Sequence, residues 1–174
     1  MKRGRWLAKW GGHFYTGCMS LATHSISIVQ AKLSEQLCRI ESGFFFANDE
    51  AIFFSGNPRR GYISSARLSI HTMLAQSTAV WTELDENPNC RLEKEGLIIW
   101  GGSTSWEGDG FLAVSHASSG ELIWLLHLQG AEAFTEIALE NGVMRARSGQ
   151  YPEIFVWEIP LNSPEALKVV LFHA

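Results

Sequence analysis

Two acidic side chains in a glycine-rich segment are the first candidates for chemistry in this sequence. Residues 101–110 read GGSTSWEGDG, which places Glu107 and Asp109 two positions apart and directly after Trp106. Paired carboxylates beside an aromatic ring could act as general acid and base on a glycosidic bond, or could bind a sugar. The same composition is typical of a solvated loop, and we favour that interpretation. It does not indicate a phosphate-binding loop, because no lysine follows the glycines and both acids would repel phosphate.

The histidines and cysteines follow no metal-binding or catalytic pattern. The six histidines form no HxH or HExxH motif, and the three cysteines are too widely spaced for a CxxC motif. Ser115, His116 and Asp109 could be combined into a hydrolase triad, but no serine lies in a GxSxG motif and a triad is defined by its geometry. The sequence therefore predicts no enzyme, no cofactor and no metal site.

Charge is distributed unevenly along the chain, whose formal net charge is −4. Residues 1–82 hold nine basic and four acidic side chains, whereas residues 83–174 hold five basic and fourteen acidic ones. The ordinary explanation is that the two halves neutralise each other in the folded protein. The functional one is a basic partner, because an acidic half attracts a basic surface and repels nucleic acid.

The opening of the chain predicts a cytoplasmic protein. Its basic start resembles a signal peptide, but Lys9, Gly11 and Gly12 interrupt the apolar stretch that export requires. No apolar run approaches the 18–20 residues or so that span a bilayer, so we expect no membrane association. The length of 174 residues predicts a single domain over residues 1–174, with residues 1–24 as a loosely ordered lead-in.

The elements that position the candidate residues are expected to be mostly strands. In the first half, residues 26–41 have apolar side chains at helical spacing and predict one N-terminal helix. Two aromatic runs around residues 48–50 then predict a β-hairpin. Residues 62–75 fit either a strand or a helix, and we favour the strand. Residues 79–84 predict a further strand, which the polar stretch 85–89 should end as a turn.

Two hairpins in the second half have a predictable register. Residues 111–116 and 122–129 flank a short glycine-containing loop, so we expect Val114 opposite Trp124 and Leu112 opposite Leu126. Asn141-Gly142 is a favoured type I′ turn. The pairs that this second turn predicts are Leu139 with Met144, Ile137 with Ala146 and Glu136 with Arg147.

The remaining segments complete a mainly β fold. Residues 97–100 and 154–159 predict buried strands, and residues 164–170 predict a short C-terminal helix, with a last strand over 169–172 as the alternative. We therefore expect an antiparallel meander closed as a sandwich, a barrel or a strongly twisted sheet. Of the tryptophans, Trp106 is the one expected at the surface.

Part of the sequence resembles small β-rich immunity proteins of bacterial polymorphic-toxin and contact-dependent-inhibition systems. The segments that carry the resemblance are Glu95–Ile98, Trp106–Ala113, Leu122–Leu125, Asn141–Val143 and Phe155–Pro160. They lie within residues 95–160, a range that covers a little over a third of the chain. The resemblance implies a cytosolic antidote that binds its cognate toxin directly.

Charge and expected exposure indicate where such a toxin would bind. Many cytosol-acting toxins are nucleases with basic clefts, and complementary charge accelerates docking onto a cleft of that kind. The candidate partner-binding residues lie in two expected loops and are Glu83, Asp85, Glu86, Trp106, Glu107 and Asp109. The alternatives are a carbohydrate-binding or other ligand-binding β domain, or a hydrolase, that uses the 101–110 loop, and a subunit of a larger complex.

Overall fold

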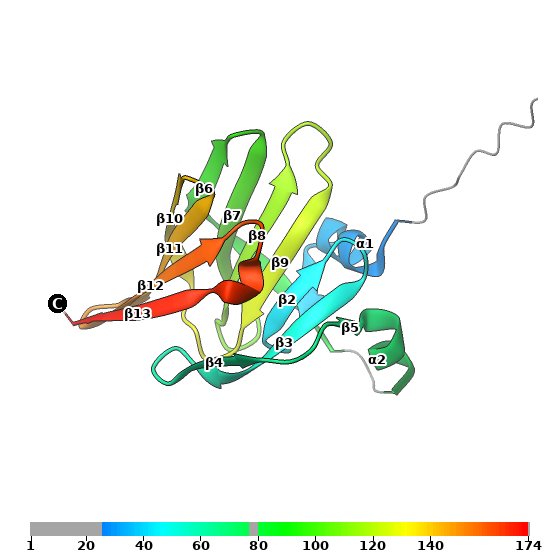
Figure 1. Ribbon diagram of the computed structural model, residues 1–174, viewed down its shortest axis with the longest axis horizontal. Coiled ribbons are helices and arrows are strands. Elements are labelled where there is room, and N and C mark those ends of the chain that lie inside the picture. Colours follow the sequence, from blue (N-terminus) through cyan, green and yellow to red (C-terminus); the bar gives the residue numbers. More distant parts are fainter. Residues whose placement is uncertain (1–25, 77–79, 174) are drawn as a thin grey trace, which may run out of the picture.

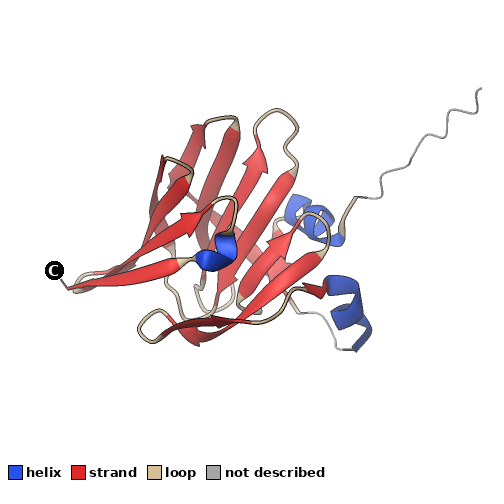
Figure 2. Cartoon of the chain, viewed as in Figure 1, coloured by secondary structure: helices blue, strands red, loops and turns tan. Residues whose placement is uncertain are grey.

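The chain folds mainly into antiparallel β-sheets, which stack on one another (Figures 1 and 2). The structure is a computed structural model that describes residues 26–76 and 80–173. The lead-in expected for residues 1–24 lies outside these residues. Within them, no helix is long and apolar enough to cross a membrane.

The larger sheet has nine strands in the order β1-β6-β7-β8-β9-β2-β3-β4, with β5 paired to β3. Its strands are β1 (Leu37–Arg39), β2 (Gly43–Phe46), β3 (Glu50–Asn57), β4 (Gly61–Ser64), β5 (Leu68–Ser69), β6 (Trp81–Lys94), β7 (Leu97–Thr104), β8 (Gly110–His116) and β9 (Leu122–Leu128).

The larger sheet must be strongly curled, because one short segment pairs with distant strands. β1 pairs with β6 and β2 pairs with β9, and only residues 40–42 join β1 to β2. In a flat sheet β1 and β2 would lie five strand spacings apart, about 24 Å. The four Cα–Cα steps from Arg39 to Gly43 span at most about 14 Å. The sheet therefore has to bend to bring β1 and β2 together. In the described residues no ladder joins β1 to β2, so the barrel option is not realised as a closed barrel.

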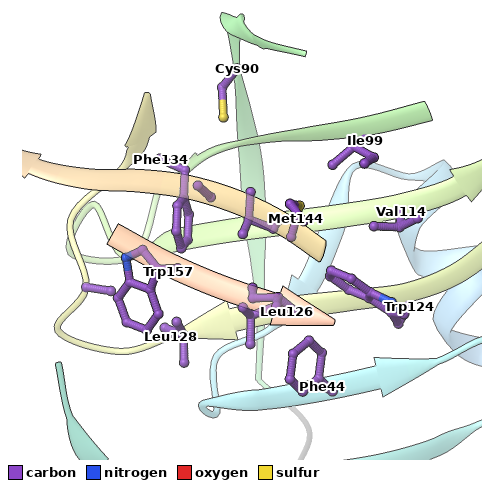
Figure 3. Close-up of a cluster of buried hydrophobic side chains, with 14 of the residues drawn as sticks. Phe44, Cys90, Ile99, Val114, Trp124, Leu126, Leu128, Phe134, Met144 and Trp157 are labelled. Carbon is purple, nitrogen blue, oxygen red and sulfur yellow. The ribbon is translucent and has the colours of Figure 1, made fainter. Parts of the chain in front are cut away.

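The smaller sheet has four strands in the order β10-β11-β12-β13. They are β10 (Phe134–Glu140), β11 (Val143–Gln150), β12 (Glu153–Pro160) and β13 (Lys168–His173). The sheet packs on one face of the larger sheet, and its buried side chains interdigitate there with those of β2 and β6 to β9 (Figure 3). A second core lies on the other face of the larger sheet.

The N-terminal helix is shorter than the apolar spacing predicts. α1 spans Ile28–Ser34 and begins at Ser27, whose side chain accepts a hydrogen bond from the backbone of Gln30 at 3.0 Å. Gln36 has a φ of 57°, which turns the chain out of the helix, and β1 follows at once. The apolar residues after Ser34 thus serve a strand, and the helix expected over 26–41 is wrong in its second half.

Residues 62–75 are also divided between two kinds of structure. They contain the end of β4, the short β5 and the start of α2 (Ile70–Gln76). Ile70 is 2% exposed and packs in the second core, so its burial fixes the start of the helix. The preferred all-strand interpretation is therefore wrong for the second half of this range.

Residues 85–89 do not form the expected turn. β6 runs through them instead, with a register shift between Glu86 and Arg91. Pro88 is tolerated there because the ladder of hydrogen bonds is interrupted. β7 likewise extends to Thr104 across a stretch expected to be a loop. Gly102 makes this possible, since a Cβ atom there would lie 2.1 Å from the carbonyl oxygen of Asp85.

Both predicted hairpin registers are confirmed. β8 and β9 pair Val114 with Trp124, and β10 and β11 pair Leu139 with Met144. The guanidinium of Arg147 donates to the carboxylate of Glu136 at 2.8 Å. The remaining predicted pairs, also found, are Leu112 with Leu126 and Ile137 with Ala146.

At the C-terminal end the alternative prediction is the better one. Residues Pro164–Ala166 form a single 3-10 turn (η1), and β13 follows. The helix expected over 164–170 is therefore limited to its first turn. Leu167 and Leu171 pack against the core between the sheets, which is the environment that a strand in this position provides.

Candidate functional site

Four of the six candidate residues come together on one exposed surface, which we call the acidic surface: Glu83, Asp85, Trp106 and Glu107. Glu83 and Asp85 lie on β6, and Trp106 and Glu107 lie in the turn that joins β7 to β8. β6 pairs with the end of β7 next to that turn, with Asp85 opposite Ser103. Residues separated by more than 20 positions thus become neighbours.

Hydrogen bonds fasten the turn to β6. The backbone N–H of Ser105 donates to the carbonyl of Glu83 at 3.0 Å, and that of Trp106 donates to Oγ1 of Thr82 at 3.0 Å. The hydroxyl groups of Thr82 and Ser105 lie 3.1 Å apart. The turn is therefore held against the strand that carries the other two carboxylates.

The alternation of β6 turns both of its carboxylates outward. Thr82 and Leu84 are buried, whereas Glu83 and Asp85 between and beyond them are exposed. Residues two apart on a strand share a face and lie about 7 Å apart. Strand geometry therefore sets the spacing of these two negative charges.

The carboxylates of the acidic surface are not neutralised from within the described part of the chain. Glu83, Asp85 and Glu107 take part in none of its ion pairs. Glu86 differs, because it accepts a hydrogen bond from Arg91 at 2.8 Å and is half-buried. We therefore leave Glu86 outside the acidic surface.

The tip of the five-residue connection between β7 and β8 has two consecutive residues with positive φ. Glu107 and Gly108 have φ values of 55° and 74°, and the N–H of Asp109 donates to the carbonyl of Trp106 at 3.2 Å. The left-handed conformation costs a residue such as glutamate about 1–2 kcal/mol. It projects Glu107 at the tip, beside Trp106, whose side chain is 45% exposed.

Asp109 is not part of the surface, and its expected exposure is wrong. It is 4% exposed, and its Oδ1 accepts a hydrogen bond from the backbone of Gly130 at 2.8 Å. Its Oδ2 lies 3.9 Å from Nε2 of His127. Asp109 thus anchors the β7–β8 turn to the chain that follows β9.

His127 is fully buried beside Asp109. Its Nδ1 lies 3.2 Å from the carbonyl oxygen of Glu41, which can only accept a hydrogen bond. Burial lowers the pKa of His127, although this carbonyl and the nearby carboxylates of Asp109 and Glu41 oppose that effect. The neutral ring with its proton on Nδ1 fits this environment.

The buried Cys38 on β1 is not a catalytic nucleophile. Burial, reinforced by the negative charge of Asp109, raises the pKa of the Cys38 thiol far above its ordinary value. A nucleophilic cysteine requires the opposite shift. Burial is also the main cause that raises the pKa of Cys90, to about 12.

The other catalytic combination considered from the sequence is not assembled. Ser115 and His116 are consecutive on β8, with Ser115 buried and His116 exposed. Their side chains therefore point to opposite faces of the sheet and cannot form a triad with Asp109. Among the residues that the structure describes, no group of three potential metal ligands is found.

The sequence analysis named the four residues of the acidic surface, whose role stays a prediction, but missed the packing of Asp109 against His127. Asp109 and His127 come from the start of β8 and the end of β9, and Glu41 comes from the link between β1 and β2. No short motif contains them. The signal that was available is the pairing of β8 with β9, which places Phe111 opposite His127 and so brings Asp109 near that ring.

Comparison with protein-family models and with curated proteins finds no match for this chain.

Proposed function

We propose that this chain is an immunity protein that binds a cognate bacterial toxin and occludes its active site. The observation that carries the proposal is the acidic surface, where three carboxylates without an ion pair in the described residues lie on β6 and in the adjoining turn that carries an exposed tryptophan. The proposed partner is a cytosol-acting nuclease, because such an enzyme needs a basic cleft for its own substrate. The proposed compartment is the cytoplasm.

Each part of the acidic surface has a physical role in such a complex. Glu83, Asp85 and Glu107 would steer a basic protein into contact, since complementary charges raise association rates by orders of magnitude at low salt. Trp106 would supply the apolar contact, because tryptophan is enriched among the residues that dominate binding energies. The charges would thus mainly raise the association rate, and the tryptophan would mainly lower the dissociation rate.

The backbone of Glu107 supports this assignment. A strained residue at an exposed turn is a reason to look for function, because asparagine or glycine would occupy the same conformation at lower cost. Strain alone does not identify the site, since Glu95 in the β6–β7 turn has nearly the same φ of 55°. What distinguishes Glu107 is its position beside Trp106 and opposite the acids of β6.

A rescue assay tests the function directly. The C-terminal part of the protein encoded next to this chain would be expressed in a naive host, with and without this chain. We expect toxicity that this chain relieves, together with cleaved nucleic acid in the unprotected cells. Toxicity without relief would contradict the pairing. Stabilisation of this chain by an oligosaccharide in a thermal melt would instead favour the carbohydrate-binding alternative.

A pair of matched variants tests the surface. Glu107→Lys should lower the association rate with the toxin at least tenfold at low salt and weaken the salt dependence of that rate. Glu95→Lys is the control, because it makes the same charge change at a turn with the same backbone at the opposite end of β7. Equal effects of the two variants would place the toxin elsewhere.

A further inference from the structure

β13 is the one edge strand of the described structure that combines a length of six residues with an uninterrupted ladder, and its lysine, Lys168, lies at its first position. The other three sheet edges are blunted: β1 has three residues, β4 has four and includes a glycine, and β10 contains a register shift. β13 has six residues, pairs with β12 in a continuous register and contains no proline or glycine. Such an edge offers unpaired backbone donors and acceptors to another strand.

The outer face beside this edge is apolar from Val170 to Phe172, beyond the charged pair formed by the positions Glu158 and Lys168. β12 and β13 pair Ile154 with Phe172 and Val156 with Val170. Val170 is 48% exposed and Phe172 is 53% exposed. The β10–β11 half of the same sheet instead carries ion pairs such as that between Arg147 and Glu136. The apolar side chains are thus concentrated at the open edge, which is where an added strand would cover them.

A groove continues along the start of the edge. In Figure 1, β12 lies above β13 and β4 lies below it. The groove between β4 and β13 has a volume of about 310 Å³, and its lining includes Phe54, Tyr62 and Leu167. The hydroxyl group of Tyr62 is buried there without a hydrogen-bond partner. An incoming strand could place its end in this preformed space, although the buried hydroxyl group of Tyr62 would stay out of its reach.

We propose that two copies of this chain associate through antiparallel pairing of their β13 strands. An interface about a two-fold axis brings each central residue against its own copy, so it requires an uncharged strand centre. β13 meets this requirement: with the axis at Val170, valine meets valine. Lys168 then lies opposite Phe172 of the second copy, where the ammonium group can lie against the ring. The end of each strand reaches the groove beside β4 of the other copy.

This interface uses a different surface from the proposed toxin site. The acidic surface belongs to β6 and the β7–β8 turn in the larger sheet, whereas β13 is an edge of the smaller sheet. A dimer would therefore present two acidic surfaces. The inference does not depend on the proposed function, because the oligomeric state can be measured without a toxin.

Charge substitutions at the axis provide the test, with sedimentation velocity as the readout. The full-length wild type should sediment as a dimer. Val170→Lys and Val170→Glu should each sediment as monomers, because like charges then meet at the axis, and an equimolar mixture of the two should restore a dimer. Val80→Lys is the control: Val80 is 41% exposed and precedes β6, so the substitution should leave the dimer intact.

The same samples identify the outcomes that overturn the proposal. A monomeric wild type at the highest soluble concentration would refute self-pairing, as would a Val170→Lys variant that remains dimeric. Thermal melts of all variants show whether they are folded. Since Val170 is half-exposed, we expect each variant to melt near the temperature of the wild type measured at a concentration low enough for the dimer to dissociate.

Discussion

Two turns with similar φ values serve different purposes in this molecule. Asn141-Gly142 joins β10 to β11 directly with φ values of 51° and 73°, and Glu107-Gly108, with 55° and 74°, forms the tip of the five-residue connection between β7 and β8. Asparagine accepts the left-handed conformation readily, whereas glutamate does not. The first turn is therefore optimised for the fold. The second places a carboxylate where the fold alone would favour another residue.

The charged side chains around the two turns also differ. Asn141 is exposed, and the acids and bases near it pair with one another across β10, β11 and β12. The turn of Glu107 has a buried anchor, Asp109, and an outer surface of carboxylates without ion pairs. The comparison suggests that stability at the second turn comes from beneath it, which leaves its outer side chains free for binding.

The largest effect should come from removing that anchor. Asp109→Ala leaves the Gly130 N–H without its hydrogen-bond partner and removes the buried carboxylate beside the His127 ring, and should lower the free energy of unfolding by about 2–4 kcal/mol. Glu140→Ala, which removes an exposed acid beside the other turn, should change it by less than about 0.5 kcal/mol. Urea unfolding of both variants measures the difference. Similar losses would mean that Asp109 does not anchor its turn.

The buried histidine beside the anchor predicts a pH dependence. The pKa of His127 is lowered in the folded protein from its ordinary 6.5, so the unfolded chain takes up a proton first as pH falls. Stability should therefore be retained above about pH 6.5 and lost below it, by at most about 1.4 kcal/mol per pH unit from this group. Urea titrations between pH 7 and pH 5 measure the slope.

Two histidine variants assign that slope. His127→Gln should flatten it, although this variant will be less stable at every pH. His116→Gln changes an exposed histidine on the neighbouring strand and should leave the slope as it is in the wild type. A slope that survives in His127→Gln would assign the pH dependence to other groups.

Exchanging the turn residues should give the smallest and most direct comparison. Glu107→Asn should raise the free energy of unfolding by about 0.5–1 kcal/mol, and Asn141→Glu should lower it by a similar amount, because the backbone preference is reversed at each site. Thermal unfolding measures both. Only Glu107→Asn should also weaken binding to the proposed toxin. A Glu107→Asn variant that is no more stable than the wild type would show that the left-handed glutamate carries no cost.

These turns also show how much of the fold could be predicted. Asn141-Gly142 was recognised because both residues favour the required backbone, and the register of β10 and β11 followed from it. The turns at Glu95-Gly96 and Glu107-Gly108 have nearly the same φ values, but glutamate gives no such signal. Local sequence therefore predicts a turn where each residue favours the backbone conformation of that turn. It does not predict a turn whose conformation is imposed by the tertiary structure.

Long-range contacts account for the other errors. Residues 85–89 have the composition of a turn, yet the close approach of Gly102 to Asp85 keeps them in β6. The exposure expected for the candidate acids holds for Glu83 and Asp85 on β6 but is wrong for Asp109, which turns inward to Gly130. Its burial depends on three segments that meet only in the folded sheet.

The segment that contains β1 and β2 has a consequence for the order of folding. Its second half pairs Phe44 with Leu126 and Phe46 with Trp124, across some 80 positions of sequence. Contacts this distant form slowly, and during synthesis β2 cannot meet its partner until residue 128 or so has left the ribosome. Phe44 and Phe45, which are both buried in the folded protein, therefore lack their β9 partners while most of the larger sheet is being synthesised. In the cell this interval is when the nascent chain should depend most on chaperones.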